Sequence, residues 1–248
     1  MEPSYIGITG FTKLDDIHAT TRLAQRLGYP GERSIMFGYL TSENRVREPT
    51  QRGTRSPAVR DLPALVAAAP SWSIPMLHYH TKHPERMRAD IDELVTATGA
   101  PAVQLNMPWP DRDDIAALVD KHAGLNVVLQ LPARAMDGLT KEQTAERAAR
   151  YDGLVAYALI DRSGGTGIAF DLEPTAALVR ALEDAMPRTT IAVAGGFTPE
   201  NVGDRLRFLD GHAKRPYAID AESGVMTDNA LDLRKIEIYL ARAMGLQL

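Results

Sequence analysis

The stretch GLVAYALIDRSGGTGIAFD, residues 153–171, joins a run of apolar residues to a single aspartate and then to a cluster of glycines. A short apolar run bounded by turn residues is typical of a buried strand in a parallel sheet. The aspartate, Asp161, stands where such a strand ends. It is therefore either a catalytic acid at the mouth of a barrel or the polar end of a buried strand.

Similar apolar runs recur along the chain at intervals of ~25 to 30 residues, and amphipathic segments separate them. The segments 14–28, 84–99 and 111–124 each end at a glycine, as helix C-termini favour. Eight strand–helix units predict an α/β protein with one (β/α)8 TIM barrel domain over residues 1–248, and a doubly wound open sheet is the alternative. The predicted strands are Tyr5–Thr9, Ser34–Tyr39, Ser73–His78, Ala102–Asn106, Asn126–Leu131, Gly153–Ile160, Thr189–Ala194 and Tyr217–Ala221.

The chain has 248 residues, of which 44% are hydrophobic and 24% are charged, as in ordinary globular proteins. Its net charge of −4 provides no basic field for a nucleic-acid backbone, and the absence of cysteine excludes disulfides and thiol nucleophiles. We find neither a signal peptide nor an apolar run long enough to span a membrane. We therefore expect a cytoplasmic protein without nucleic-acid or membrane partners, and a homodimer is compatible with these features.

Polar residues stand at the carboxyl ends of the predicted strands, the face that carries the active site in barrel enzymes. The alternative for each residue taken alone is a buried polar group whose hydrogen bonds are satisfied within the core. The residues concerned are Thr9, His78, His80, Gln104, Asn106, Gln130, Asp161, Asp220 and Glu222.

Three glycine-rich turns follow the late strands, at residues 163–167, 194–201 and 222–225. Glycine lets the main chain approach a ligand closely, and exposed turn amides then point at an anion. Barrels of this type commonly hold a phosphate on the loops after strands seven and eight. The candidate phosphate-binding residues are Gly165, Gly195, Gly196, Ser223 and Gly224.

A long loop over about residues 41–62 carries five arginines against three acidic residues. It is either a solvated surface insertion or a cationic loop over an anionic substrate, because arginine binds carboxylates and phosphates through paired hydrogen bonds.

His78 and His80 share one face of their predicted strand end, a spacing that would also suit two ligands of a divalent metal. No third ligand stands at a standard spacing, so we predict no metal and no other cofactor. Imidazoles titrate near neutral pH, which makes both histidines candidate bases, and the carboxylate of Glu222 is another. The alternative is a solvent-facing histidine cluster at the start of a loop.

Four blocks of sequence resemble the phosphoribosylanthranilate isomerase family. They are ITGFTKLDD at 8–16, IDRSGGTGIAFD at 160–171, AVAGGFTPENV at 192–202 and DAESGVMTDNALDLRKI at 220–236, and the last three are the specific ones. Their order and spacing match the family along nearly the whole chain. The resemblance implies a barrel of the ribulose-phosphate-binding kind and a small phosphorylated substrate.

The resemblance also implies an Amadori rearrangement, in which an aminoaldose phosphate becomes an aminoketose phosphate. A general acid protonates the ring oxygen of the sugar, and a general base removes the C2 proton of the resulting Schiff base. By resemblance Asp161 is the acid, and Arg45 in the long loop meets the carboxylate of the substrate. We further assign Gln104, Asn106 and Asp220 to substrate binding.

The chain departs from the family pattern at three strand ends. Residues 7–10 read GITG where the family has Lys-Ile-Cys-Gly with cysteine as the base, and Thr9 has no thiolate-like form near neutral pH. Residues 104–107 read QLNM where the family has Gln-Leu-His-Gly. Residues 222–224 read ESG where the family has Ser-Ser-Gly, which adds a negative charge beside the phosphate turn. The base therefore stays open among Thr9, His78, His80 and Glu222.

These observations predict an intramolecular oxidoreductase (isomerase) similar to phosphoribosylanthranilate isomerase, an enzyme of tryptophan biosynthesis. Two alternatives on the same scaffold stay open. One is a lyase or metal-assisted aldolase built around His78, His80 and Glu222, and the other is a non-catalytic barrel that binds a phosphorylated metabolite.

Overall fold

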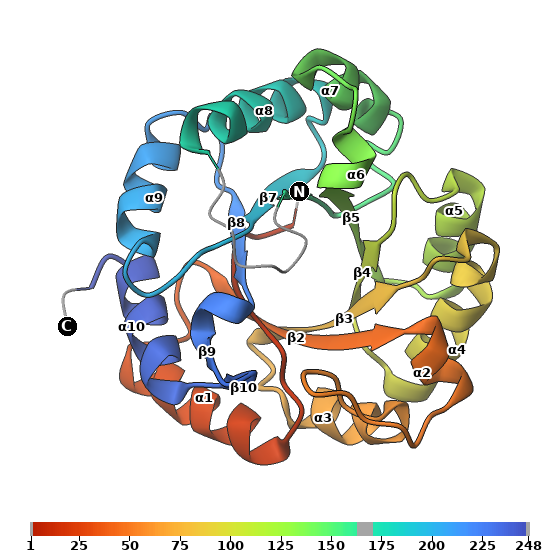
Figure 1. The fold of residues 1–248 in the computed structure, drawn as a ribbon, viewed down its shortest axis with the longest axis vertical. Helices are drawn as coiled ribbons and strands as arrows, with labels where there is room; N and C mark the ends of the chain where they lie inside the picture. Colours follow the sequence, from red (N-terminus) through yellow and green to blue (C-terminus); the bar gives the residue numbers. More distant parts are fainter. Residues whose placement is uncertain (1, 163–170, 247–248) are drawn as a thin grey trace.

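The chain forms a closed barrel of parallel strands surrounded by helices, seen in a computed structural model that describes residues 2–162 and 171–246 (Figure 1). The barrel runs in chain order from β1 to β8, and β1 pairs with β8 to close it. Its strands are β1 (Tyr5–Thr9), β2 (Ser34–Ser42), β3 (Ser73–His80), β4 (Ala102–Asn106), β5 (Asn126–Pro132), β6 (Tyr157–Asp161), β7 (Thr190–Ala194) and β8 (Ala218–Ala221). The predicted TIM barrel is confirmed.

Helices follow the strands and cover the outside of the barrel (Figure 1). The α-helices are α1 (Leu14–Arg26), α2 (Glu43–Arg47), α3 (Leu62–Ala68), α4 (Met87–Thr98), α5 (Arg112–Lys121), α6 (Ala133–Met136), α7 (Lys141–Ala149), α8 (Leu172–Ala185), α9 (Val202–Asp210) and α10 (Leu233–Ala243). Short 3-10 helices are η1 (Val59–Asp61), η2 (Pro84–Arg86) and η3 (Ser223–Val225), and the small strands β9 (Met226–Thr227) and β10 (Ala230–Leu231) form a hairpin before α10.

Two apolar layers result from the alternation of side chains along each strand. One layer, between strands and helices, contains most of the buried Ile, Leu and Val residues. The other fills the inside of the barrel, where Tyr5 and Tyr157 meet edge to face with ring centroids 5.1 Å apart. Because Leu159 belongs to this inner layer, Asp161, two residues further along β6, shares its inward face. Strand geometry thus aims the aspartate at the barrel mouth.

The structure corrects several sequence-based boundaries. The strand predicted at Gly153–Ile160 begins only at Tyr157 and ends at Asp161, since Gly153 has a φ of +75° that a strand does not use. The strands predicted to end at Tyr39 and His78 extend to Ser42 and His80. The region predicted as a loop over about 41–62 contains the end of β2, helix α2 and η1. The strand errors lie at element ends, where apolar periodicity is weakest, and the two missed helices are only five and three residues long.

Of the three glycines predicted to end helices, Gly99 caps α4 directly, whereas α1 and α5 end two and three residues before Gly28 and Gly124. Gly28, Gly99 and Gly124 have φ values of +97°, +65° and +83°, in the left-handed region that glycine enters without a steric penalty. Within residues 2–162 and 171–246, no helix is long and apolar enough to cross a membrane.

Candidate active site

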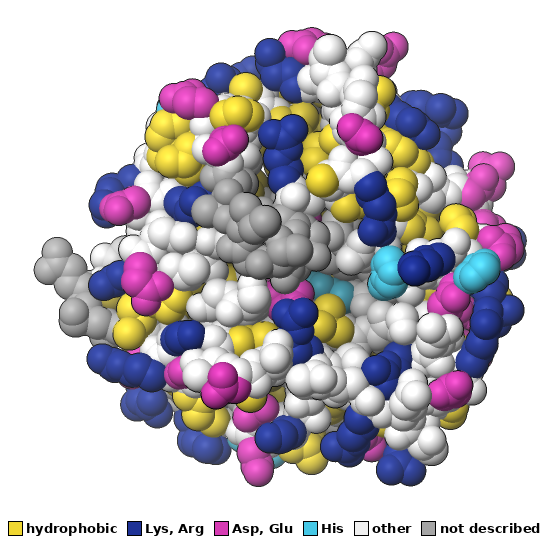
Figure 2. Space-filling view, in the orientation of Figure 1, with side chains coloured by type: hydrophobic (Ala, Val, Ile, Leu, Met, Phe, Trp, Pro, Cys, Tyr) yellow, Lys and Arg dark blue, Asp and Glu magenta, His cyan; other side chains and the backbone are white. Residues whose placement is uncertain are grey.

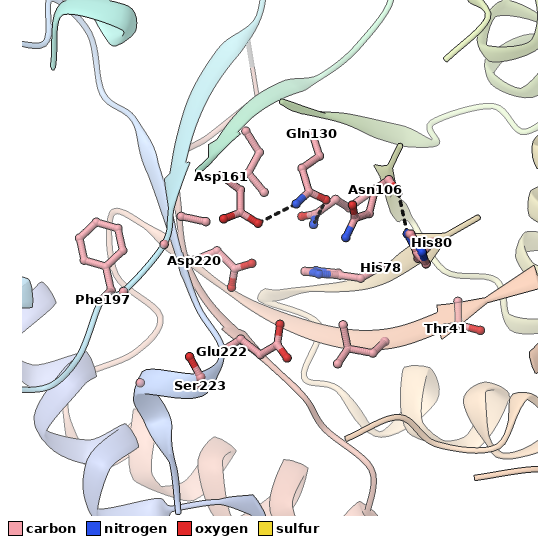
Figure 3. A pocket seen from close by; sticks show the side chains of 17 residues that line it. Thr41, His78, His80, Asn106, Gln130, Asp161, Phe197, Asp220, Glu222 and Ser223 are labelled. Carbon is pink, nitrogen blue, oxygen red and sulfur yellow. Dashed lines mark hydrogen bonds between the residues drawn. The ribbon is translucent and has the colours of Figure 1, made fainter. Parts of the chain in front are cut away.

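One pocket at the carboxyl end of the barrel brings together most of the predicted site residues. In the space-filling view, acidic and histidine side chains are visible together near the centre of the face (Figure 2). Figure 3 shows the labelled side chains converging from several strands. The predicted residues that line this pocket are His78, His80, Gln104, Asn106, Asp161, Gly195, Gly196, Asp220, Glu222, Ser223 and Gly224.

Three predicted residues stand apart from this lining set. Thr9 is buried at the end of β1 and contacts the site through Asp220. Arg45 lies on α2, and among the described residues it does not line the pocket. Its guanidinium instead faces Gly53 within the same loop, where an added Cβ would lie 2.5 Å from Nη2 of Arg45. Gly165 falls outside the described residues.

A chain of two side-chain amides orients Asp161. The Gln130 Nε2 donates a hydrogen bond of 2.8 Å to Oδ2 of Asp161, and Gln104 Nε2 donates one of 3.1 Å to Oε1 of Gln130 (Figure 3). All three side chains are buried. The bonds run from β4 to β5 to β6, so that neighbouring strands determine the direction in which each amide points. The carboxylate of Asp161 is therefore held in one orientation at the pocket wall.

A second carboxylate, that of Asp220, enters the pocket from β8. The hydroxyl of Thr9 donates to it, with Oγ1 at 3.0 Å from Oδ1 and 3.2 Å from Oδ2. Gly7 is paired with Asp220 in the sheet, and a Cβ on Gly7 would lie 2.7 Å from Oδ1 of the aspartate. The carboxylate of Asp220 therefore fits at this position because Gly7 has no side chain.

The environment of Asp220 raises its pKa to about 7. Burial is the largest cause because it disfavours the charged carboxylate, and repulsion from Glu222 and Asp161 acts in the same direction. The hydrogen bond from Thr9 opposes these effects because it favours the charged form. Asp220 thus exchanges its proton close to neutral pH.

The imidazole of His78 lies beside this pair. A Cβ on Gly38 of β2 would be 2.4 Å from Oγ1 of Thr9 and 3.0 Å from Nε2 of His78, so both side chains occupy the space that this glycine leaves free. Burial lowers the pKa of His78 to about 3, which keeps the ring neutral at physiological pH. Its Nε2 is buried in the pocket wall and has no hydrogen-bond partner among the described residues.

His80 is held differently, at the rim of the pocket. Its Nδ1 lies 3.0 Å from the carbonyl oxygen of Asn106, so this nitrogen must carry the proton that is donated (Figure 3). Arg134 Nη2 donates to the same carbonyl and to Oδ1 of Asn106, each at 3.1 Å. Within residues 2–162 and 171–246, no group of three His, Cys, Asp or Glu side chains has the geometry to hold a metal ion.

The turns after β7 and β8 form one continuous wall. Gly195 and Gly196 have φ values of +106° and +70°, and Asn201 closes the first turn by donating from Nδ2 to the carbonyl of Gly196 at 2.8 Å. A Cβ on Gly224 would lie only 1.9 Å from the carbonyl oxygen of Phe197. The two backbones are therefore in direct contact, and glycine is required at this point.

The long loop contacts a pocket-lining residue, Glu222, through Arg55 rather than Arg45. Arg55 Nη1 lies 2.8 Å from Oε1 of Glu222. Burial raises the pKa of Glu222, and repulsion from Asp161 adds to this effect, whereas Arg55 opposes it. The negative charge that Glu222 adds beside the predicted phosphate turn thus faces an arginine.

Sequence reasoning missed parts of this arrangement. Arg55 was one arginine among five in its loop, and nothing local distinguished it. Gln130 was visible as a polar strand end but was not assigned a role, although it holds Asp161. Phe197 also lines the pocket, and its place directly after two glycines was the only available signal.

Comparisons with known proteins indicate one family. A family model described as N-(5′-phosphoribosyl)anthranilate (PRA) isomerase matches residues 116–242. The N-(5′-phosphoribosyl)anthranilate isomerase of Natronomonas pharaonis is 29% identical over 160 residues, which cover 62% of this chain and 72% of that protein. The enzyme of the same name from Listeria welshimeri is 32% identical over 97 residues, which cover 37% of this chain and 43% of that protein.

A solved structure shares the fold along the whole chain. It is named as phosphoribosyl anthranilate isomerase in complex with reduced 1-(o-carboxyphenylamino)-1-deoxyribulose 5-phosphate. The match has a TM-score of 0.66 at 18% identity and covers 98% of this chain and 100% of the other. The segment matched by the family model, from 116 to 242, contains Asp161, both described glycine turns and Asp220. The chain therefore belongs to the N-(5′-phosphoribosyl)anthranilate isomerase family.

Proposed function

We propose that this chain is an isomerase that converts N-(5′-phosphoribosyl)anthranilate, or a closely related aminoaldose phosphate, into the corresponding aminoketose phosphate. The observation that carries the proposal is the position of Asp161, which Gln130 orients in a pocket whose opposite wall is made of glycine turns. Membership of the isomerase family supports the same reaction.

In this proposal Asp161 is the general acid. Its carboxyl group gives a proton to the ring oxygen while the bond between that oxygen and C1 breaks, and the nitrogen lone pair forms the C1=N bond of a Schiff base. A base then removes the proton on C2. The C–H electrons form a C1=C2 bond, and the C=N electrons return to nitrogen. The enolamine becomes the ketose when the C2 hydroxyl loses its proton and C1 gains one.

The remaining site residues would bind the substrate. We assign the phosphate to the wall formed by Gly195, Gly196, Ser223 and Gly224, because turn amides favour an anion there. Gly165 keeps this role only as a sequence-based prediction. Arg55 replaces Arg45 as our candidate for the carboxylate on the aromatic ring, because it already holds the carboxylate of Glu222 at the pocket. Gln104 and Asn106 offer polar contacts from β4.

Growth of a tryptophan auxotroph that lacks this isomerase step tests the proposal directly. Expression of the chain should restore growth without tryptophan, and expression of Asp161→Asn at an equal level should not. Failure of a folded wild-type chain to support growth, together with no conversion of N-(5′-phosphoribosyl)anthranilate in vitro, would overturn it. In that case the non-catalytic barrel is the alternative, detected by a rise in Tm with ribose 5-phosphate.

A further inference from the structure

We propose that Asp220 is the general base that removes the C2 proton, and that Thr9 positions it by donating its hydroxyl proton to the carboxylate. This inference rests on the proposed isomerase function and adds the group that the family resemblance leaves open in this chain. It is carried by the contact between Thr9 and Asp220 at the closure of the barrel.

The hydroxyl of Thr9 is unsuited to act as the base itself. It is a donor to both carboxylate oxygens of Asp220, at 3.0 and 3.2 Å. A threonine hydroxyl also has no accessible anionic form near neutral pH. Thr9 on β1 therefore orients Asp220 on β8, and the carboxylate of Asp220 takes the place of the missing thiol.

The surrounding backbone is built to admit this carboxylate. Gly7 occupies the position where the family pattern has lysine, and any side chain there would meet Oδ1 of Asp220 and Cε of Met36, each at 2.7 Å from an added Cβ. The loss of the lysine and the loss of the cysteine therefore belong together. Glycine in place of the lysine makes room for the carboxylate of Asp220, and threonine in place of the cysteine supplies its hydrogen-bond donor.

The other candidate bases are less suitable. His78 stays neutral but is a weak base, because burial lowers its pKa to about 3. Glu222 is engaged with Arg55 at 2.8 Å. His80 uses Nδ1 as a donor to Asn106 and lies at the rim of the pocket, away from the closure of the barrel.

The proton balance of the step is simple. In the proposed reaction Asp220 acts as a carboxylate and gains the C2 proton, while Asp161 acts as the acid and gives a proton to the ring oxygen. The two aspartates therefore end the conversion to enolamine with exchanged protonation states, and no oxidant or metal is needed. Proton exchange with solvent and the tautomerisation of the enolamine restore both groups.

The pH dependence of kcat/KM gives a signature of this role. Asp220 must be ionised, so that its pKa of about 7 appears as the acidic limb of the profile. Thr9→Val removes a hydrogen bond that favours the charged form and moves the limb to higher pH, whereas Glu222→Gln removes a repelling charge and moves it to lower pH. The titratable groups that face Asp220 from the packed elements are Tyr5, His78, Asp161, Glu222 and Tyr239.

The test compares Asp220→Asn with Asp90→Asn, a matched change at another buried aspartate that accepts a hydroxyl proton, from Tyr79 at 2.6 Å, on helix α4. We expect Asp220→Asn to lower kcat by about 1,000-fold while the Kd for reduced 1-(o-carboxyphenylamino)-1-deoxyribulose 5-phosphate changes by less than about threefold. Asp90→Asn should lower Tm and keep kcat.

Several results would overturn the assignment. One is an active wild type whose Asp220→Asn variant keeps more than about a tenth of kcat, and another is a variant that loses affinity for the reduced compound. A Thr9→Val profile with an unmoved acidic limb contradicts it as well, and this measurement stands even if Asp220→Asn does not fold. If the wild type neither binds the reduced compound nor converts the substrate, the proposed function fails first and the assignment fails with it.

Discussion

Asp161 and Asp220 enter the same pocket but have different donors as neighbours. A neutral amide, from Gln130, donates to Asp161, whereas a hydroxyl, from Thr9, donates to Asp220. Two carboxylates in one site take separate acid and base roles when their surroundings differ in this way. The two donors are therefore the residues whose removal is most informative at this scale.

Gln130→Leu should reduce kcat/KM by about 10- to 100-fold, because Asp161 loses the bond that orients it. Gln104 would also lose the acceptor of its amide, at a cost of about 1 to 3 kcal/mol in the free energy of unfolding. Steady-state kinetics and thermal unfolding measure the two effects. Gln25→Leu, at an exposed position of α1, is the control, and full activity in Gln130→Leu would contradict the orienting role.

Asp220→Asn should stabilise the protein at pH 8. The pKa of Asp220 is about 7 in the folded chain against 3.8 as its ordinary value, so between these two pH values the folded state binds a proton that the unfolded state lacks. The free energy of unfolding therefore falls by about 1 kcal/mol for each pH unit across that window and stays low above it. Asparagine carries no charge and avoids this loss. Urea unfolding at pH 5 and pH 8 measures it, and an unchanged difference between variant and wild type at the two pH values would contradict the buried ionisation.

The turns after β7 and β8 act as a pair at the scale of elements. Their glycines could be recognised in the sequence because a position with positive φ favours glycine, as at Gly195 and Gly196. The contact between them was not visible, because it joins Gly224 to Phe197 across two separate turns. The same limit applies to the long loop, where Arg55 reaches Glu222 from a distant strand end. Local patterns therefore predicted the elements, but not the contacts that assemble the site.

Gly224→Ala should raise KM for the phosphorylated substrate by about tenfold or more, because the added Cβ would lie 1.9 Å from a backbone oxygen and force the two turns apart. If these turns hold only the phosphate, kcat should change less than KM. Gly31→Ala is the matched control, since a Cβ there meets nothing within 4 Å. Equal KM values for the two variants would argue against a phosphate wall at these turns.

The two halves of the chain bring different parts of the site. The family model matches residues 116–242, which contain Asp161, Asp220 and the described glycine turns. Thr9, His78 and the arginine-rich loop precede that segment. Closure of the barrel joins the halves, since β1 pairs with β8 and places Thr9 against Asp220, 211 positions away in sequence. Strand periodicity predicted the barrel, but it contained no information on which polar side chains would meet where β1 pairs with β8.

One domain over residues 1–248 stays a prediction at this scale, and unfolding tests it. Because the barrel is closed through β1 and β8, we expect urea to unfold the chain in one cooperative transition, with fluorescence and circular dichroism giving the same midpoint. Two transitions with separate midpoints would show that the halves unfold independently.

Turnover of N-(5′-phosphoribosyl)anthranilate by the purified chain, compared with that of Asp161→Asn, tests the central claim most directly. The wild type should form the aminoketose phosphate, and the variant should be slower by about 1,000-fold while its Tm stays within about 2 °C, since asparagine keeps the acceptor for Gln130. Undiminished turnover in the variant, or a large loss of stability with activity retained, would contradict the account.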